Sequence, residues 1–216
     1  MNSGPRFADR HDAGRRLAER LTHYAGGEDV VVLGLPRGGM PVAFEVAHAL
    51  AVPLDVLVVR KLGVPGHEEL AMGAVASGGV RVLNNDVLAA TGAPRDVIEE
   101  VTARELEHVG AQERAYRGDR PPLDVRGRVA ILIDDGLATG ATMRAAVAAL
   151  RDRGAGAIVV AVPTAPAEAC EALRREVDEI VCALMPEPFM AVGLWYRDFA
   201  PVSDQQVREL LEPPPA

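Results

Sequence analysis

Aromatic residues are scarce in this 216-residue chain, which has one Trp, three Tyr and four Phe, or 4% of the sequence. The core must therefore be built mainly from Val, Leu, Ile and Ala, which suits parallel strands buried on both faces. No hydrophobic run approaches the roughly 18 residues that a membrane-spanning helix needs. The N-terminal region also lacks the apolar segment of a signal peptide. These absences predict a cytoplasmic protein with no membrane partner.

Cysteine is nearly absent, and the two that occur, Cys170 and Cys182, have no zinc-ligand spacing and are too few for a disulfide framework. We expect two reduced thiols in a cytosolic protein. Acidic residues outnumber basic ones by 31 to 23, for a formal net charge of −8. This balance argues against a nucleic-acid partner, which attracts clustered Lys and Arg. A small phosphorylated ligand stays possible, because a local loop binds an anion whatever the global charge.

Short runs of Val, Ile and Leu alternate with segments of helical spacing. The runs predict five buried strands, at residues 30–35, 54–59, 129–133, 157–162 and 179–184. The helical segments between them include residues 9–25, 41–51 and 141–153. Such alternation favours a parallel sheet covered on both faces. We predict a single α/β domain, residues 1–216, doubly wound around a mainly parallel five-stranded sheet.

Residues 62–128 interrupt this alternation. A Gly-rich, strand-like stretch at 73–84 precedes a charged stretch of helical spacing at 95–117. We predict an insertion that serves as a mobile lid, with a rigid dimerisation arm, and hence a homodimer, as the alternative. Residues 186–212 are predicted to form a small hood-like C-terminal unit, whose last helix starts at a capping box.

The most informative stretch is VAILIDDGLATGATM, residues 129–143. A buried strand ends in Asp134 and Asp135, and a loop of small residues then leads into a helix. Small residues let successive backbone N–H groups point at one spot, and the helix N-terminus adds positive charge, so the loop suits a phosphate. The two carboxylates suit hydroxyl groups or a divalent cation. A phosphate site beside a diol or metal site is typical of sugar-phosphate binding; the alternative is a tight turn with an N-cap.

This stretch resembles the 5-phosphoribosyl-1-pyrophosphate (PRPP) motif of type I phosphoribosyltransferases, which consists of an apolar strand, two acids and a loop ending in TG-x-T. The resemblance implies that Asp134 and Asp135 hold the ribose 2′- and 3′-hydroxyls, act in catalysis and bind Mg²⁺. It also implies that the 5′-phosphate is bound by Ala138, Thr139, Gly140, Ala141 and Thr142. In having alanine at position 138, the loop resembles that of the adenine and uracil enzymes. It argues against a 6-oxopurine acceptor, because hypoxanthine-guanine enzymes carry Asp there.

Two other strand ends carry candidate binding residues. After the first strand, Gly38 and Gly39 allow a close backbone approach, and the Arg37 guanidinium can fork onto a pyrophosphate oxygen. This segment resembles the pyrophosphate loop of the family, which often contains a cis peptide; a plain glycine turn is the alternative. At the end of the second strand, Arg60 and Lys61 are predicted to bind PRPP, because ligands of open α/β sheets gather at that edge. An ordinary solvated strand end is the alternative.

The C-terminal segment FMAVGLWYRDF, residues 189–199, contains the only Trp. Flat rings above a sugar site suit stacking on a base, so Trp195 and Tyr196 are predicted to bind the acceptor, with packing of the C-terminal unit as the alternative. The combined hypothesis is a glycosyltransferase that moves the 5-phosphoribosyl group of Mg²⁺–PRPP to an unidentified nitrogen nucleophile and releases pyrophosphate. A non-catalytic regulator that binds PRPP or a nucleotide is the alternative. A sugar-phosphate hydrolase is less favoured, because neither an Asp-x-Asp nor a G-x-S-x-G nucleophile motif occurs.

Overall fold

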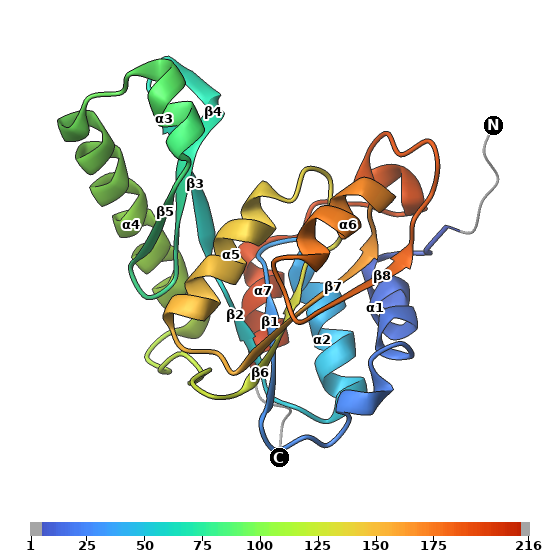
Figure 1. Cartoon of the computed structure of the whole chain (residues 1–216). Coiled ribbons are helices and arrows are strands. Elements are labelled where there is room, and N and C mark those ends of the chain that lie inside the picture. The colour runs from blue at the N-terminus through green and yellow to red at the C-terminus, as the bar shows by residue number, and fades with distance from the viewer. Residues whose placement is uncertain (1–5, 213–216) are drawn as a thin grey trace.

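A computed structural model of the chain describes residues 6–212, apart from the side chains of residues 68 and 69. Its larger sheet has five parallel strands in the order β2-β1-β6-β7-β8 (Figure 1). The strands are β1 (Val30–Gly34), β2 (Leu54–Val56), β6 (Val129–Ile133), β7 (Ala157–Thr164) and β8 (Glu179–Leu184). All five predicted strands are confirmed, although β2 ends earlier than expected, at Val56.

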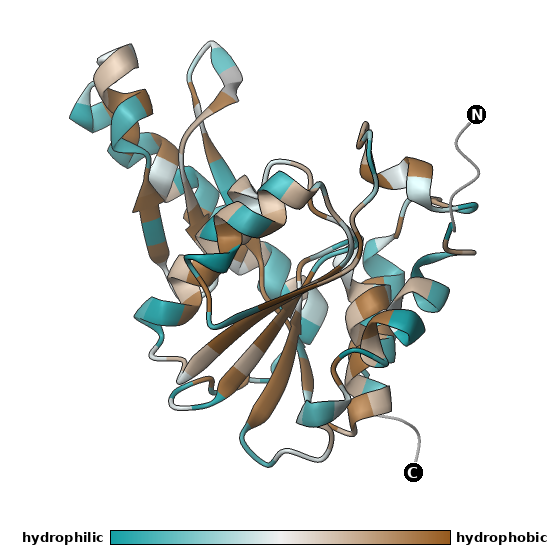
Figure 2. Ribbon diagram, turned by 45° about the vertical axis from the view of Figure 1, so that its right-hand side comes forward, coloured by the Kyte–Doolittle hydropathy of each residue, from teal (hydrophilic) through white to brown (hydrophobic). Residues whose placement is uncertain are grey.

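Helices cover both faces of this sheet, because successive side chains of a buried strand point to opposite faces. In β1, Val32 packs in the cluster of α1 and α2, whereas Leu33 packs in that of α5 and α6. These helices are α1 (Arg10–Ala18), α2 (Gly39–Leu50), α5 (Ala141–Asp152) and α6 (Ala167–Arg174). Figure 2 shows the apolar strands enclosed between helices with polar outer faces. The doubly wound arrangement is therefore confirmed. In the described part of the chain, no helix is both long and apolar enough to cross a membrane.

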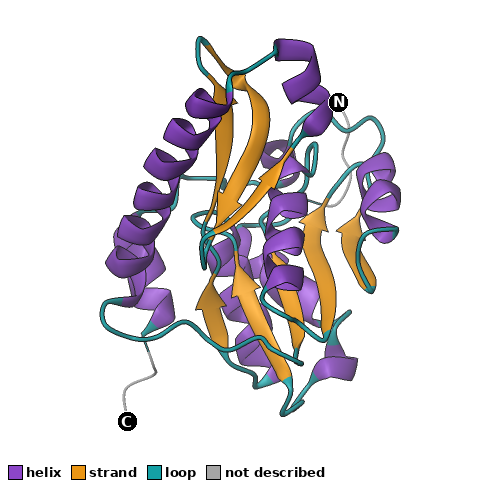
Figure 3. Cartoon of the chain, turned by 60° about the vertical axis from the view of Figure 1, so that its left-hand side comes forward, coloured by secondary structure: helices purple, strands orange, loops and turns teal. Residues whose placement is uncertain are grey.

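The chain between β2 and β6 forms a separate unit, which we call the arm (residues 59–117). It consists of an antiparallel sheet in the order β3-β4-β5, followed by two helices (Figure 3). The elements are β3 (Val59–Val64), β4 (His67–Ala76), β5 (Val80–Leu83), α3 (Asn85–Thr91) and α4 (Arg95–Arg117). The helix expected at 95–117 is confirmed. The break in the parallel alternation begins at Val59 and not at residue 62, because the run expected as one strand divides between β2 and β3.

The arm is fastened to the parallel sheet by packing and by a buried ion pair. The last helix, α7 (Asp204–Leu211), starts at the expected capping box and packs against α4 through an apolar cluster that includes Val207 and Tyr116. At the end of α4, the Nε of Arg117 lies 2.7 Å from Oδ1 of Asp55 in β2, and both side chains are buried. Removing one partner of such a pair costs about 3–5 kcal/mol. The base of the arm is therefore held firmly. Two short 3₁₀ helices, η1 (Thr22–Tyr24) and η2 (Val192–Trp195), complete the fold.

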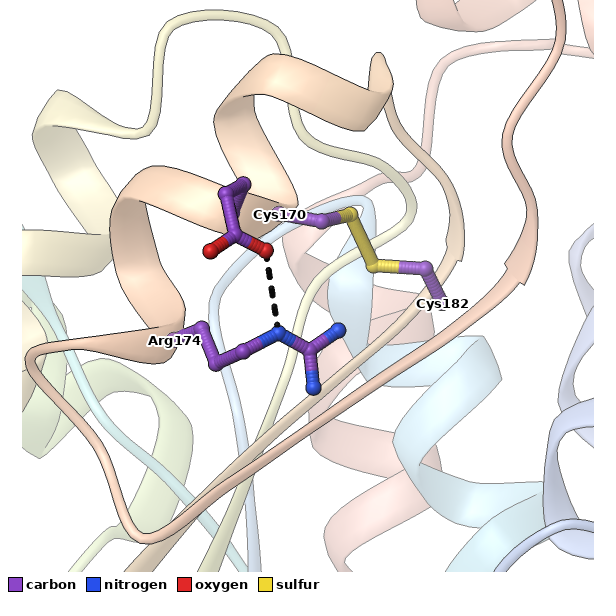
Figure 4. The surroundings of a disulfide bond; sticks show 4 residues. Cys170, Arg174 and Cys182 are labelled. Carbon is purple, nitrogen blue, oxygen red and sulfur yellow. Dashed lines mark hydrogen bonds and ion pairs between the residues drawn. A yellow bond between two sulfur atoms is a disulfide. The ribbon is translucent and has the colours of Figure 1, made fainter.

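The two cysteines form a disulfide, contrary to the expectation of reduced thiols (Figure 4). Cys170 lies in α6 and Cys182 in β8, 12 residues apart in sequence. Because α6 packs directly on β8, the turn between them brings the two side chains together. The absence of a multi-cysteine framework does not exclude such a single local pair. The cysteines therefore no longer support a reducing compartment.

Candidate active site

Asp134 and Asp135 follow β6 at the carboxyl edge of the parallel sheet and form the centre of the site. Both are half-buried, and Oδ1 of Asp134 accepts a hydrogen bond of 2.8 Å from the backbone N–H of Asp135. Burial raises the pKa of Asp134 well above its ordinary value, and the negative charge of Asp135 raises it further. Burial also raises the pKa of Asp135. Two carboxylates held this close favour a bound cation or a hydroxyl donor.

A cation of the chain itself already contacts one of these acids. Nε and Nη2 of Arg10, at the start of α1, each lie 2.8 Å from Oδ2 of Asp135. The positive charge of Arg10 opposes the burial effect and lowers the pKa of Asp135. The same guanidinium stacks on the ring of Phe199, 3.8 Å from its centre, and donates to the carbonyl oxygen of Ala200. Sequence reasoning missed Arg10, because nothing in a segment 125 residues away marks it as a partner of Asp135.

The glycines after β1 allow the turn to lie directly against the acid pair. A Cβ atom at Gly38 would lie 2.1 Å from Oδ2 of Asp135. One at Gly39 would lie 2.7 Å from the carbonyl oxygen of Ile133. Both distances are far shorter than a carbon–oxygen contact permits, so only glycine fits at either position without a shift. The predicted pyrophosphate loop and the acid pair are thus brought together.

Arg37 lies in this turn with its side chain half exposed, 53% of it accessible to solvent. Its Nη1 is 3.9 Å from Oδ1 of the exposed Asp204 in α7, a separation at which an ion pair contributes little. The peptide bond between Pro36 and Arg37 is cis, as the resemblance implied. The N–H of Gly39 donates to the carbonyl oxygen of Leu35 at 3.0 Å. That amide is therefore already used within the turn.

The loop after the acids ends at an open helix terminus. Gly140, the N-cap of α5, has a φ of +77°, a left-handed conformation that favours glycine, and no side chain caps the helix. By contrast, side chains of Asp9 and Ser203 cap α1 and α7. The first N–H groups of a helix have no partner within it, so an uncapped terminus is suited to an anion. The predicted loop residues lie at this terminus: Ala138, Thr139 and Ala141 are exposed, Thr142 is half-buried and Gly140 is buried.

Arg60 and Lys61 do not stand at the end of a parallel strand, so the prediction of their position is wrong. They lie within β3, because β2 ends at Val56 and the chain then enters the arm. Nε of Arg60 donates to Oε2 of Glu105 in α4 at 2.7 Å. Lys61 instead lines a cavity of about 520 Å³ whose lining also includes Ala141 in the first turn of α5. Of the pair, Lys61 therefore lies near the loop at 138–142 that is predicted to bind phosphate.

The chain matches the family model described as a phosphoribosyl transferase domain, over residues 7–187. It belongs to the phosphoribosyl transferase family. A Mycobacterium tuberculosis protein provisionally named a phosphoribosyl transferase is 48% identical over 206 residues, which cover 95% of this chain and 46% of that protein. The solved structure of TT1426 from Thermus thermophilus superposes with a TM-score of 0.84 at 45% identity, covering 95% of this chain and 97% of that one.

A more distant relative is the ribose-phosphate pyrophosphokinase of Methanopyrus kandleri, 29% identical over 187 residues, which cover 85% of this chain and 46% of the kinase. The chain thus spans about half the length of the curated relatives it matches.

The two aromatic side chains predicted to bind the acceptor are buried. The hydroxyl of Tyr196 donates to the backbone carbonyl of Asp135, and Trp195 is 7% exposed. Val192, at the start of η2, packs closely on Gly136. A Cβ atom added at Gly136 would lie 2.4 Å from Cγ1 of Val192. Residues 192–196 therefore lie beside the acid pair, but neither ring presents a free face for stacking. A role in acceptor binding stays a prediction that this conformation does not support.

The chemistry of the acid pair fits a magnesium ion. Among the described residues, no group of three or more His, Cys, Asp and Glu side chains gathers to hold a metal ion. Mg²⁺ commonly needs only one or two carboxylates, with water and substrate phosphates as its other ligands. The raised pKa of Asp134, caused partly by the charge of Asp135, indicates negative charge that a cation would offset. Asp134 and Asp135 are the residues that would hold it.

Proposed function

We propose that this chain transfers the 5-phosphoribosyl group of PRPP to a nitrogen nucleophile and releases pyrophosphate. The observation that carries the proposal is the uncapped N-terminus of α5, five residues after the acid pair on the same loop. An anion site and a hydroxyl-binding or cation-binding site are thereby adjacent, as a phosphorylated sugar requires. Family membership supports a transferase.

In this proposal, the 5′-phosphate accepts hydrogen bonds from the first N–H groups of α5 and from the hydroxyls of Thr139 and Thr142. The ribose hydroxyls donate to Asp134 and Asp135. Arg10 favours the ionised form of Asp135 and fixes the position of its carboxylate. The sugar is thus oriented at two points, which places its C1 atom for attack.

The pyrophosphate leaves toward the turn after β1. Arg37 is available to receive it, because its contact with Asp204 is long and exposed. Bound with PRPP, Mg²⁺ would supply electrostatic stabilisation of the pyrophosphate charge. As positive charge develops at C1, the carboxylates below the ribose lie where they stabilise it, and exclusion of water protects the reacting centre. Lys61 of the arm lines the same cavity as Ala141, which supports a role for its positive charge in phosphate binding.

Calorimetric binding of Mg²⁺–PRPP to the double variant Asp134→Asn/Asp135→Asn tests this proposal. We expect loss of measurable binding with an unchanged circular dichroism spectrum, because the amides retain the shape but remove the charge. Asp29→Asn, at an exposed residue before β1, is the control and should bind as the wild type does. Unchanged PRPP affinity in a folded double variant contradicts the assignment.

A second measurement separates the enzyme from a regulator. Pyrophosphate release is followed with PRPP and a panel of purines, pyrimidines, ammonia and aromatic amines. Release with any member supports the transferase and identifies the class of acceptor. Tight PRPP binding without release across the panel supports the non-catalytic alternative.

A further inference from the structure

A second cavity, of about 320 Å³, lies at the far end of α5 from the phosphate loop. We call it the arginine cavity, because its lining includes Arg114, Arg117, Arg120 and Arg153 but only one acid, Glu113. The 12 residues of α5 span about 18 Å, so this cavity is well separated from the loop at 138–142. Its walls come from α4, from the turn between β4 and β5, and from the C-cap of α5.

One of the four arginines already has acidic partners. Arg117 is buried, with 6% of its side chain exposed, and contacts Oδ1 of Asp55 at 2.7 Å and Oε1 of Glu113 at 2.8 Å. It also donates to the carbonyl oxygen of Val56. These contacts hold Arg117 rigidly in the cavity wall, so it forms a fixed part of the lining.

The other three arginines have no carboxylate within 4 Å among the described residues. Arg153 is half-buried, and its Nη2 donates to the carbonyl oxygen of Leu123 at 2.9 Å. Within residues 6–212, Arg120 donates only to backbone carbonyl oxygens. Arg114 folds its guanidinium over Gly110, where a Cβ atom would lie 3.3 Å from Nη1. Three cationic groups therefore surround one cavity without direct neutralisation.

The surroundings of Arg153 disfavour the protonated form of its guanidinium group. Burial lowers the pKa of Arg153, and the positive charge of Arg117 lowers it further. The negative charges of Asp55, Glu113 and Asp124 act in the opposite direction without cancelling the effect. An anion in the cavity would offset the repulsion between the guanidinium groups.

We propose that the arginine cavity binds the phosphate or pyrophosphate group of a small molecule, at a site separate from the candidate active site. Guanidinium groups match phosphate oxygens in pairs, and a cavity of this size accommodates a pyrophosphate group. Arg114 belongs to the arm and Arg153 to α5, on the parallel sheet. A bound anion would therefore join the two units at the base of the arm.

Counting bound pyrophosphate by equilibrium dialysis in EDTA tests the proposal. In EDTA the turn after β1 has no Mg²⁺ with which to hold pyrophosphate beside Arg37, so the wild type should bind about two pyrophosphate ions per chain, one at the phosphate loop and one in the arginine cavity. Arg114→Gln/Arg153→Gln should retain only the ion at the loop. Gly140→Asp, which places a carboxylate in the phosphate loop, should retain only the ion in the arginine cavity. Arg95→Gln removes one positive charge, as Arg114→Gln does, but at the exposed start of the same helix α4, and it should bind as the wild type does.

The outcomes separate this inference from the proposed function. If Gly140→Asp alone removes all bound pyrophosphate, or if the arginine variant binds as much as the wild type, the arginine cavity is not a site. If Gly140→Asp leaves the number of bound pyrophosphate ions unchanged, the assignment of the loop at 138–142 as a phosphate site is contradicted instead. Should the double variant fail to fold, Arg114→Gln alone decides, because its side chain is exposed and makes no ion pair in the described part of the chain. A wild-type affinity in that variant overturns the proposal.

Discussion

Asp134→Asn should stabilise the ligand-free protein at neutral pH while it weakens PRPP binding. Asparagine keeps the shape of the side chain, and its Oδ1 can still accept the 2.8 Å hydrogen bond from the N–H of Asp135. The substitution removes only a negative charge that burial and the neighbouring carboxylate both disfavour. A gain in stability together with a loss of ligand binding is expected where a residue serves binding at the expense of folding stability.

The sign of the stability difference and its pH dependence follow from the direction of the pKa shift. Because the pKa of Asp134 is higher in the folded than in the unfolded chain, the folded protein binds more protons between the two values. The free energy of unfolding of the wild type therefore falls as pH rises through that interval. Stabilising substitutions commonly add about 0.5–2 kcal/mol to the free energy of unfolding, and we expect a gain of this size for the variant at neutral pH. The gain should shrink as pH falls toward the ordinary aspartate pKa of about 3.9, below which the carboxyl group becomes protonated in both states.

Urea unfolding in EDTA, over a series from about pH 4 to pH 8, measures this difference. Each kcal/mol corresponds to about 2–4 °C in Tm for a chain of this size. Asp29→Asn serves again as the control, and its difference from the wild type should stay within about 0.5 kcal/mol throughout. A variant less stable than the wild type at pH 7, or a difference that does not change with pH, would refute the reasoning.

Two further predictions concern the loop and the arm. Gly140→Ala should cost about 1–2 kcal/mol in unfolding free energy, because its φ of +77° is left-handed, and should also weaken PRPP binding. Gly26→Ala, with a φ of +67° and open space around the missing Cβ, should cost as much stability without changing the affinity for PRPP. If the two variants change the affinity for PRPP equally, the loop at Gly140 does not bind PRPP. If the arm closes over the substrate, thermolysin should cut residues 62–80 more slowly when Mg²⁺–PRPP is added. Equal rates with and without ligand would instead indicate a rigid arm.

The parallel sheet and the chemistry of its edge could be predicted from local sequence. The strand at 129–133, the acids after it and the glycine at position 140 are neighbours along the chain, so their geometry follows from strand, turn and helix-terminus rules. The helix at 95–117 was likewise predictable, because the spacing of its apolar residues is a local property. The same reasoning failed at Arg60, because a run of apolar residues does not show where one strand ends and the next begins.

The sequence by itself therefore determined the fold class and the acid pair with the Gly-containing loop that follows it. The tertiary structure alone decided which distant side chains meet: Arg10 with Asp135, Cys170 with Cys182, and the arginines of α4 with Arg153. It also decided that Tyr196 is buried and hydrogen-bonded behind the acid pair. The physical reason is that backbone geometry and apolar periodicity act over a few residues. Ion pairs and cavities, by contrast, depend on how whole elements pack, and no local pattern records that packing.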